Sequence, residues 1–154
     1  MTTNNHAKLV CIIDSDIAID YLRLNDYAVK LFEEWAQNGP LAISSLTHYE
    51  VYRGMRVGEE ESTNSFLDAL VTIDVTIEIA RNAGKLMNGL RTKGITIDTT
   101  DAVIAATALK LNIPLITNNV SHYPFAGLKL LRGKDWRGGF LVRERRHRYS
   151  VRKS

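Results

Sequence analysis

One segment near the start of the chain, Lys8 to Ile13, constrains the fold more than any other feature. It contains an unbroken apolar run, Leu9 to Ile13, rather than an alternation of apolar and polar residues. Such runs are typical of strands buried on both faces of a parallel sheet. The polar residues Asp14-Ser15-Asp16 end the run. The segment therefore predicts a central strand that presents acidic side chains at its carboxyl end.

Helical and strand-like patterns alternate along the rest of the chain. Helical spacing of apolar residues, with glycine and proline between the segments, predicts helices over 17–22, 27–37, 45–56, 76–93 and 101–111, and one that begins at Glu59. Strands are predicted over 41–43, 70–75, 113–116 and 128–131, with 70–75 at a sheet edge. This alternation predicts an α/β fold with a mainly parallel sheet of 4–5 strands and helices on both faces.

The excess of positive charge is concentrated at the C-terminus. The chain has 154 residues and a net charge of +3, but residues 143–154 alone carry six Lys or Arg against one Glu. A cationic tail attracts phosphate backbones, although a solvated end or a partner-binding arm explains it equally well. We predict one domain over residues 1–137, followed by a basic, flexible tail over residues 138–154.

Several features predict a cytoplasmic protein without a membrane span. The apolar runs are far too short to cross a bilayer, and the N-terminus lacks the basic start and apolar stretch of a signal peptide. The chain has one cysteine, Cys11, so it can form no intrachain disulfide.

Three acidic residues stand out because each is placed at the start or end of a predicted element. Asp14 follows the first strand, Glu50 lies in the first turn of the helix after the second strand, and Asp101 begins a later helix. Each also has a purely structural interpretation. Glu50 completes a capping box with Thr47, and Asp101 favours the positive end of a helix that Thr100 can cap. Taken singly, these structural interpretations are the stronger ones.

Taken together, the three acids favour a metal site. The carboxyl ends of parallel strands meet at one edge of a sheet, where ligands bind in folds of this kind. Two carboxylates about 4 Å apart repel by about 4 kcal/mol at an effective dielectric constant near 20, so a cluster of three needs a cation or protons. Magnesium, with Mn²⁺ as a substitute, is the expected cation because it prefers oxygen ligands.

Four segments follow one another along the chain, namely Ile12 to Asp20, Ser44 to Gly54, Asp101 to Leu109 and Ile113 to Tyr123, and Leu128 to Trp136 comes after them. In this order they resemble the PIN-domain family, and in particular the toxin component of VapBC toxin–antitoxin systems. The resemblance covers roughly residues 8–136. The resemblance implies a three-layer α/β/α sandwich and a magnesium-dependent endoribonuclease that leaves 5′-phosphate and 3′-hydroxyl ends.

The resemblance also implies roles for particular residues and partners. It identifies Asp14, Glu50 and Asp101 as the metal-binding and water-activating acids, with Thr117 and Asn119 as supporting polar residues. It implies an RNA substrate, a VapB-type antitoxin and a homodimer. Three further residues are weaker candidates for metal or RNA contacts, and they are Asp98, Arg53 and Arg56.

The sequence departs from the family pattern at two places. Asp16 stands where asparagine is common, so it adds a negative charge that could bind metal or merely cap a helix. A fourth acid often occurs at or near the positions held here by Asn119 and His122. Both residues are formally neutral, which puts a second metal ion in doubt.

Three alternative functions remain open at this point. A HAD-type phosphatase is suggested by Asp14-Ser15-Asp16 after a buried strand, but Ala18 stands where that family needs Thr or Val. A non-catalytic PIN domain that binds RNA or acts as a scaffold would fit the loss of the fourth acid. A receiver-like signalling domain is the weakest alternative, because it lacks a suitably placed lysine.

Overall fold

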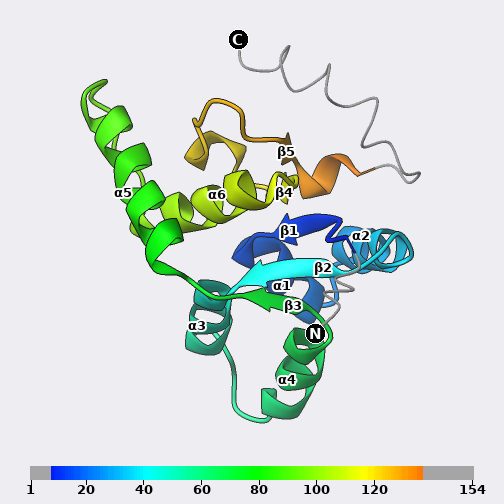
Figure 1. The fold of residues 1–154 in the computed structure, drawn as a ribbon. Helices are drawn as coiled ribbons and strands as arrows, with labels where there is room; N and C mark the ends of the chain where they lie inside the picture. The colour runs from blue at the N-terminus through cyan, green and yellow to red at the C-terminus, as the bar shows by residue number, and fades with distance from the viewer. Residues whose placement is uncertain (1–7, 137–154) are drawn as a thin grey trace, which may run out of the picture.

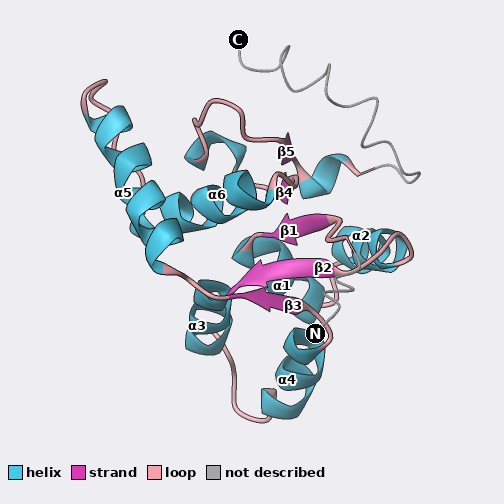
Figure 2. Ribbon diagram, in the orientation of Figure 1, coloured by secondary structure: helices cyan, strands magenta, loops and turns pink. Residues whose placement is uncertain are grey.

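A computed structural model describes residues 8–136 of the chain. Five parallel strands form one sheet in the order β3-β2-β1-β4-β5. The strands are β1 (Cys11–Ile13), β2 (Leu41–Ser44), β3 (Val71–Ile73), β4 (Leu115–Ile116) and β5 (Leu130–Leu131). The predicted parallel sheet is confirmed, with β1 at its centre and β3 at one edge (Figures 1 and 2).

Within residues 8–136, six α-helices connect and cover the strands. They are α1 (Ser15–Leu22), α2 (Asp26–Ala36), α3 (Ser45–Arg53), α4 (Glu60–Asp68), α5 (Ile77–Arg91) and α6 (Thr99–Leu111). Two short 3₁₀ turns, η1 (Val120–His122) and η2 (Gly133–Asp135), lie near the end of the described part. Four of the five strands are shorter than the sequence predicts, whereas β2 extends one residue further, to Ser44.

Successive residues of β1 point to opposite faces of the sheet and belong to different cores. Cys11 and Ile13 pack with side chains of α1, α2 and α4, whereas Ile12 packs with side chains of α5 and α6. All three residues are fully buried. This arrangement explains the unbroken apolar run, since a central strand covered on both faces has no solvent side. The three-layer α/β/α sandwich is therefore confirmed.

Two helix starts differ from the prediction. Ser44, not Thr47, caps α3, because its Oγ accepts the N–H of Leu46 at 3.1 Å. Thr47 is buried inside that helix, so the predicted capping box does not form and Glu50 lies in the second turn. Asp98, with an extended backbone, precedes α6 at the N-cap position.

The prediction that Thr100 caps α6 is consequently wrong. The helix begins at Thr99, and the carbonyl of Asp98 already accepts the N–H of Ala102 at 3.1 Å. Asp101 is thus the third helical residue rather than the first. The predicted basic tail, residues 138–154, lies wholly outside the described residues. No helix within residues 8–136 is long and apolar enough to cross a membrane.

Candidate functional site

Asp14 lies at the carboxyl end of the central strand and is only 5% exposed. It caps α1, and its Oδ1 accepts the N–H of Ser15 at 2.7 Å. Its Oδ2 accepts two hydroxyl groups, Thr117 Oγ1 at 2.7 Å and the Tyr123 hydroxyl at 2.8 Å. Three donors offset the cost of burying this carboxylate and hold it in one orientation.

The sheet register explains why Thr117 meets Asp14. Ile13 of β1 pairs with Ile116 of β4, so the next residue of each strand lies side by side at the sheet edge. Thr117 is fully buried, and its Oγ1 also accepts the backbone N–H of Asn119 at 3.0 Å. The side chain of Asn119 is exposed next to this contact. Thr117 therefore contacts Asp14 directly, whereas Asn119 is joined to Asp14 only through its backbone hydrogen bond to Thr117.

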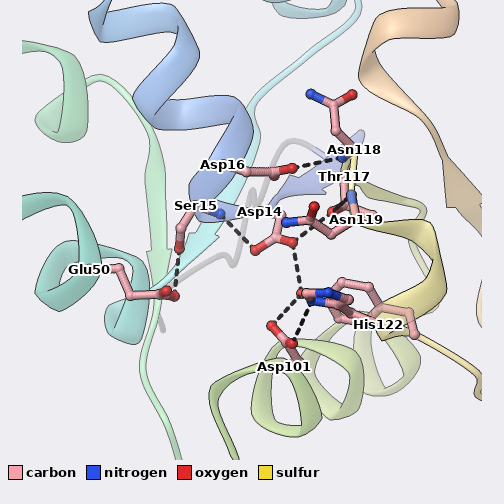
Figure 3. A network of polar contacts seen from close by, with 10 residues as sticks. Asp14, Ser15, Asp16, Glu50, Asp101, Thr117, Asn118, Asn119 and His122 are labelled. Carbon is pink, nitrogen blue, oxygen red and sulfur yellow. Dashed lines mark hydrogen bonds and ion pairs between the residues drawn. The ribbon is translucent and has the colours of Figure 1, made fainter. Parts of the chain in front are cut away.

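Asp101 approaches the same edge from α6. Its Oδ1 lies 3.2 Å from the Tyr123 hydroxyl, which also contacts Asp14. Its Oδ2 lies 3.3 Å from Nδ1 of His122, as the lower part of Figure 3 shows. Burial and the nearby charge of Asp14 raise the pKa of Asp101 above its ordinary value. Asp14 and Asp101 thus form one electronegative site, joined by a tyrosine hydroxyl.

Glu50 reaches the site through Ser15. The Ser15 hydroxyl donates to Glu50 Oε1 at 2.7 Å and lies 3.3 Å from Thr47 Oγ1. Figure 3 shows Glu50 extending from α3 toward Ser15, whose backbone N–H in turn contacts Asp14. The three predicted acids therefore belong to one polar network, although Glu50 is linked to Asp14 indirectly.

Asp16 lies on the opposite side of Asp14 from Asp101, near the loop after β4 (Figure 3). Its Oδ1 accepts the N–H of Ile17 and its Oδ2 accepts the N–H of Asn118, both at 2.8 Å. Burial, followed by the charge of Asp14, raises the pKa of Asp16 to about 7. Asp16 therefore adds a further carboxyl group to the edge where Asp14 lies.

The weaker candidates lie farther from the carboxylates. Asp98 is exposed, and its charge makes a small contribution to the raised pKa of Asp101. Arg53 and Arg56 are both exposed near the end of α3. The Arg53 guanidinium lies over the Tyr49 ring, 5.6 Å from its centroid, and the backbone N–H of Arg56 donates to Glu59 Oε2 at 2.8 Å. Within residues 8–136, no hydrogen bond or ion pair joins either arginine to Asp14 or Asp101.

Two carboxylates around one hydroxyl make an arrangement that suits a hard cation. A tyrosine hydroxyl has one proton, so Tyr123 can donate to Asp14 or to Asp101 but not to both at once. The carboxylate that accepts no hydrogen bond from Tyr123 faces the oxygen of that hydroxyl with no donor between them. A cation that prefers oxygen ligands would stabilise this carboxylate. In this conformation the described residues contain no group of three or more His, Cys, Asp or Glu side chains that could hold a metal. The donor pair is therefore Asp14 and Asp101, and a metal site stays a prediction.

Sequence reasoning missed four residues of this network. Tyr123, Ser15, Asn118 and Thr47 each contact one of the acids or their partners. Ser15 is adjacent to Asp14, and that adjacency was a usable signal. No signal in the sequence pointed to Tyr123, because it lies 109 positions from Asp14 and only the fold brings the two residues together.

Taken together, the fold and the site define a class of protein: a three-layer α/β/α domain with carboxylates at the carboxyl edge of a parallel sheet. Residues 11–127 match the family described as the PIN domain. That match spans more than half of the chain, and this chain belongs to the PIN-domain family. The match gives no support to the phosphatase and receiver-like alternatives.

The chain is similar to several proteins named as ribonucleases. It is 39% identical over 114 residues to ribonuclease VapC19 of Mycobacterium tuberculosis, covering 73% of this chain and 91% of that protein. It is 35% identical over 117 residues to ribonuclease VapC10 of the same organism, covering 73% of this chain and 85% of that protein.

Solved structures show the same fold. VapBC2 from Rickettsia felis, bound to a DNA fragment from its promoter, matches with a TM-score of 0.69 and 27% identity over 80% of this chain and 98% of that one. A toxin–antitoxin complex from Klebsiella pneumoniae matches with a TM-score of 0.68 and 26% identity, over 80% and 97% of the two chains. Membership of the family and likeness to its VapC branch, both predicted from the sequence, are confirmed.

Proposed function

We propose that this protein is an endoribonuclease that hydrolyses phosphodiester bonds in RNA and acts as the toxin of a VapBC-type pair. The observation that carries the proposal is the approach of Asp14 and Asp101, from β1 and α6, to the single hydroxyl of Tyr123. The similarity to proteins named ribonuclease VapC supports the choice of RNA.

Asp14 and Asp101 would hold a Mg²⁺ ion, or Mn²⁺ in its place, with Glu50 as the third acid of the site. Such an ion neutralises charge on the scissile phosphate and lowers the pKa of a nearby water. Two features of the chain favour the role of Asp14. Its burial limits its motion, and its three donors orient it before any ion binds.

Glu50 is the proposed acceptor of the proton from the attacking water. Ser15 orients its Oε1 by donating at 2.7 Å, and the side chain is only partly buried, so water can reach it. The water oxygen forms a bond to phosphorus while the bond from phosphorus to the 3′ oxygen breaks. The leaving 3′ oxygen takes up a proton, and the products carry 5′-phosphate and 3′-hydroxyl ends.

Contacts to the RNA backbone must come from outside the acidic edge, because carboxylates repel phosphate. Arg53 follows Glu50 by three residues on α3, so the two share one side of that helix. Arg56 lies exposed just beyond the helix. We propose both as phosphate contacts, with the exposed Asn119 as a hydrogen-bonding residue nearer the acids.

The proposed partners are a VapB-type antitoxin and a second copy of this chain. The antitoxin would cover the acidic edge and so block access of RNA. Solved relatives from Rickettsia felis and Klebsiella pneumoniae are toxin–antitoxin complexes, which supports a partner of this type.

A second candidate function is a non-catalytic PIN domain that binds RNA or acts as a scaffold. Two observations favour it. His122, rather than a further acid, faces Asp101 at 3.3 Å, and the described residues hold no cluster of three metal-binding side chains. Magnesium titration separates the two functions, since a scaffold would show no site that Asp101→Asn disrupts.

The test of the proposed function is cleavage of structured RNA by purified protein with magnesium. Asp14→Asn should lower the rate by at least about 100-fold, because it removes the charge that the ion and the developing transition state require. Asp74→Asn is a matched control. Asp74 directly follows β3 at the same edge of the sheet, is exposed, and forms no hydrogen bond or ion pair with the site among residues 8–136.

The two variants give opposite expectations. Asp74→Asn should cleave as fast as the wild type, and the ends of the products should be 5′-phosphate and 3′-hydroxyl. Equal cleavage by the wild type and Asp14→Asn would falsify the assignment and would indicate a contaminating nuclease.

A further inference from the structure

Tyr123 is held rigidly at the centre of the acidic edge. It is 1% exposed, and its ring belongs to the apolar cluster beneath β1, β4 and α6. Its backbone N–H donates to the carbonyl of Val120 at 3.1 Å, and its carbonyl accepts the N–H of Phe125 at 2.9 Å. A side chain fixed by its ring and by both backbone groups places its hydroxyl at one point.

That point lies between two carboxylates from different parts of the fold. The hydroxyl is 2.8 Å from Asp14 Oδ2 and 3.2 Å from Asp101 Oδ1. Within residues 8–136, no hydrogen bond or ion pair joins the two acids directly. Like charges this close repel. A group that attracts both carboxylates is therefore needed to keep β1 and α6 at this spacing.

The neighbouring residue His122 does not fulfil this role. It contacts only Asp101, at 3.3 Å, and its side chain is 51% exposed. Thr117 and Ser15 contact Asp14 but not Asp101. Among the described residues, Tyr123 is the side chain whose contacts include both acids.

We propose that Tyr123 is a positioning residue that sets the spacing between Asp14 and Asp101 and so prepares them for a divalent cation. The part of this inference that concerns the cation rests on the proposed function. The part that concerns the spacing applies to the protein without any ion. A residue of this kind acts through the acids and does not touch the substrate.

The test is Tyr123→Phe, which removes the hydroxyl and keeps the ring. Supporting residues of metal sites commonly contribute about 10- to 100-fold to metal affinity, so the affinity for Mn²⁺ measured by calorimetric titration should fall by about tenfold or more. The melting temperature in the presence of a chelator should also fall. Tyr21→Phe is the matched control, because Tyr21 is partly buried against Phe32 and Phe66 and its hydroxyl forms no hydrogen bond within residues 8–136.

The outcomes separate this inference from the proposed function. Unchanged or tighter Mn²⁺ binding by Tyr123→Phe, with wild-type cleavage of RNA, would overturn the role of Tyr123 and leave the nuclease proposal intact. Failure of the wild type to bind Mn²⁺ at a site that Asp14→Asn removes would instead overturn the nuclease proposal. The melting temperature in chelator would then still decide whether Tyr123 sets the spacing.

A double variant keeps the inference testable if Tyr123→Phe is too unstable to purify. Asp101→Asn removes one of the two charges, so the hydroxyl is no longer needed to hold two carboxylates together. Loss of the Tyr123 hydroxyl should therefore lower the melting temperature much less in the Asp101→Asn background than in the wild type. Folding of the double variant where Tyr123→Phe alone fails would support the inference. Equal losses in both backgrounds, or failure of both variants to fold, would overturn it.

Discussion

Leu24 adopts a backbone conformation that leucine rarely takes. It has a φ of 60° and is 76% exposed just after the end of α1. The N–H of Asn25 donates to the carbonyl of Asp20 at 3.0 Å, and the N–H of Leu24 donates to Tyr21 at 2.9 Å. This is the bonding pattern of a Schellman motif, in which glycine usually occupies the left-handed position. At the end of α6 that conformation belongs to Asn112, a residue that tolerates it better.

Leu24→Gly should therefore stabilise the protein. The left-handed conformation costs a residue with a Cβ atom about 1–2 kcal/mol, of which the greater chain entropy of glycine cancels about 0.5–1 kcal/mol. We expect a gain of about 0.5 kcal/mol in the free energy of unfolding, measured with urea. Leu22→Gly, inside the helix, should have the opposite effect. A loss of stability in Leu24→Gly would mean that the exposed side chain makes a contact that outweighs the strain.

At the scale of elements, one ion pair joins the ends of three helices. Arg23, at the end of α1, donates to Glu59 Oε1 at 2.8 Å and to the carbonyl of Gly54 at 3.2 Å. Glu59 immediately precedes α4, and its Oε2 accepts the backbone N–H of Arg56. That hydrogen bond, together with the charges of Arg23 and Arg56, holds the pKa of Glu59 below its ordinary value of 4.5.

Glu59→Gln should consequently lower stability only when Glu59 is ionised. A lowered pKa means that the folded protein favours the charged form, so the stabilisation is present above the unfolded value and disappears as the pH falls. We expect a modest drop in melting temperature at about pH 7, and this drop should shrink as the pH falls through the lowered pKa of Glu59. Glu60→Gln, in the same helical turn, controls for the helix dipole. A pH-independent difference would contradict the role of this ion pair.

At the scale of the whole molecule, the end of the described chain packs back on its first half. Trp136 is buried beside Trp35 of α2, with ring centroids 5.4 Å apart, and its Nε1 donates to Glu34 Oε2 at 2.6 Å. Both tryptophans belong to the core beneath α1 and α2. The last described turn therefore completes one of the two cores.

Trp136→Ala should destabilise the whole fold rather than only its end. Removing a buried tryptophan costs about 3–5 kcal/mol, and the loss should appear in one cooperative urea transition. Trp136→Phe keeps most of the ring and should lose less. Retention of wild-type stability by Trp136→Ala would show that the core beneath α1 and α2 is complete without this residue.

The order of the strands also decides which predictions of the site could succeed. Asp14 and Thr117 are 103 positions apart in the chain, and the pairing of β1 with β4 places them in contact. The alternation of helices and strands was enough to predict that the strand ends meet at one edge of the sheet. The identity of Tyr123 as the link between Asp14 and Asp101 was not, because it depends on the path of the chain after β4.

The failure of the predicted capping box at Thr47 and Glu50 has a similar cause. Thr47 and Glu50 have the spacing of a capping box, yet Ser15 contacts both side chains from another helix. Local spacing alone cannot show that a hydroxyl from a distant segment competes for the same oxygens. A pattern of four residues predicts a local bond only when tertiary contacts leave those side chains available.

The sequence by itself determined the layers of this protein, because the unbroken apolar run at β1 can be satisfied only where helices cover both faces of a sheet. It also determined which carboxyl groups stand at the ends of elements. Only the tertiary structure decided that Asp14 and Asp101 are joined through the hydroxyl of Tyr123 and that Glu50 is joined to Asp14 through Ser15. The reason is physical: burial follows from the apolar pattern of each segment, whereas a contact of about 3 Å between polar atoms depends on the register and packing of elements that lie far apart in the chain.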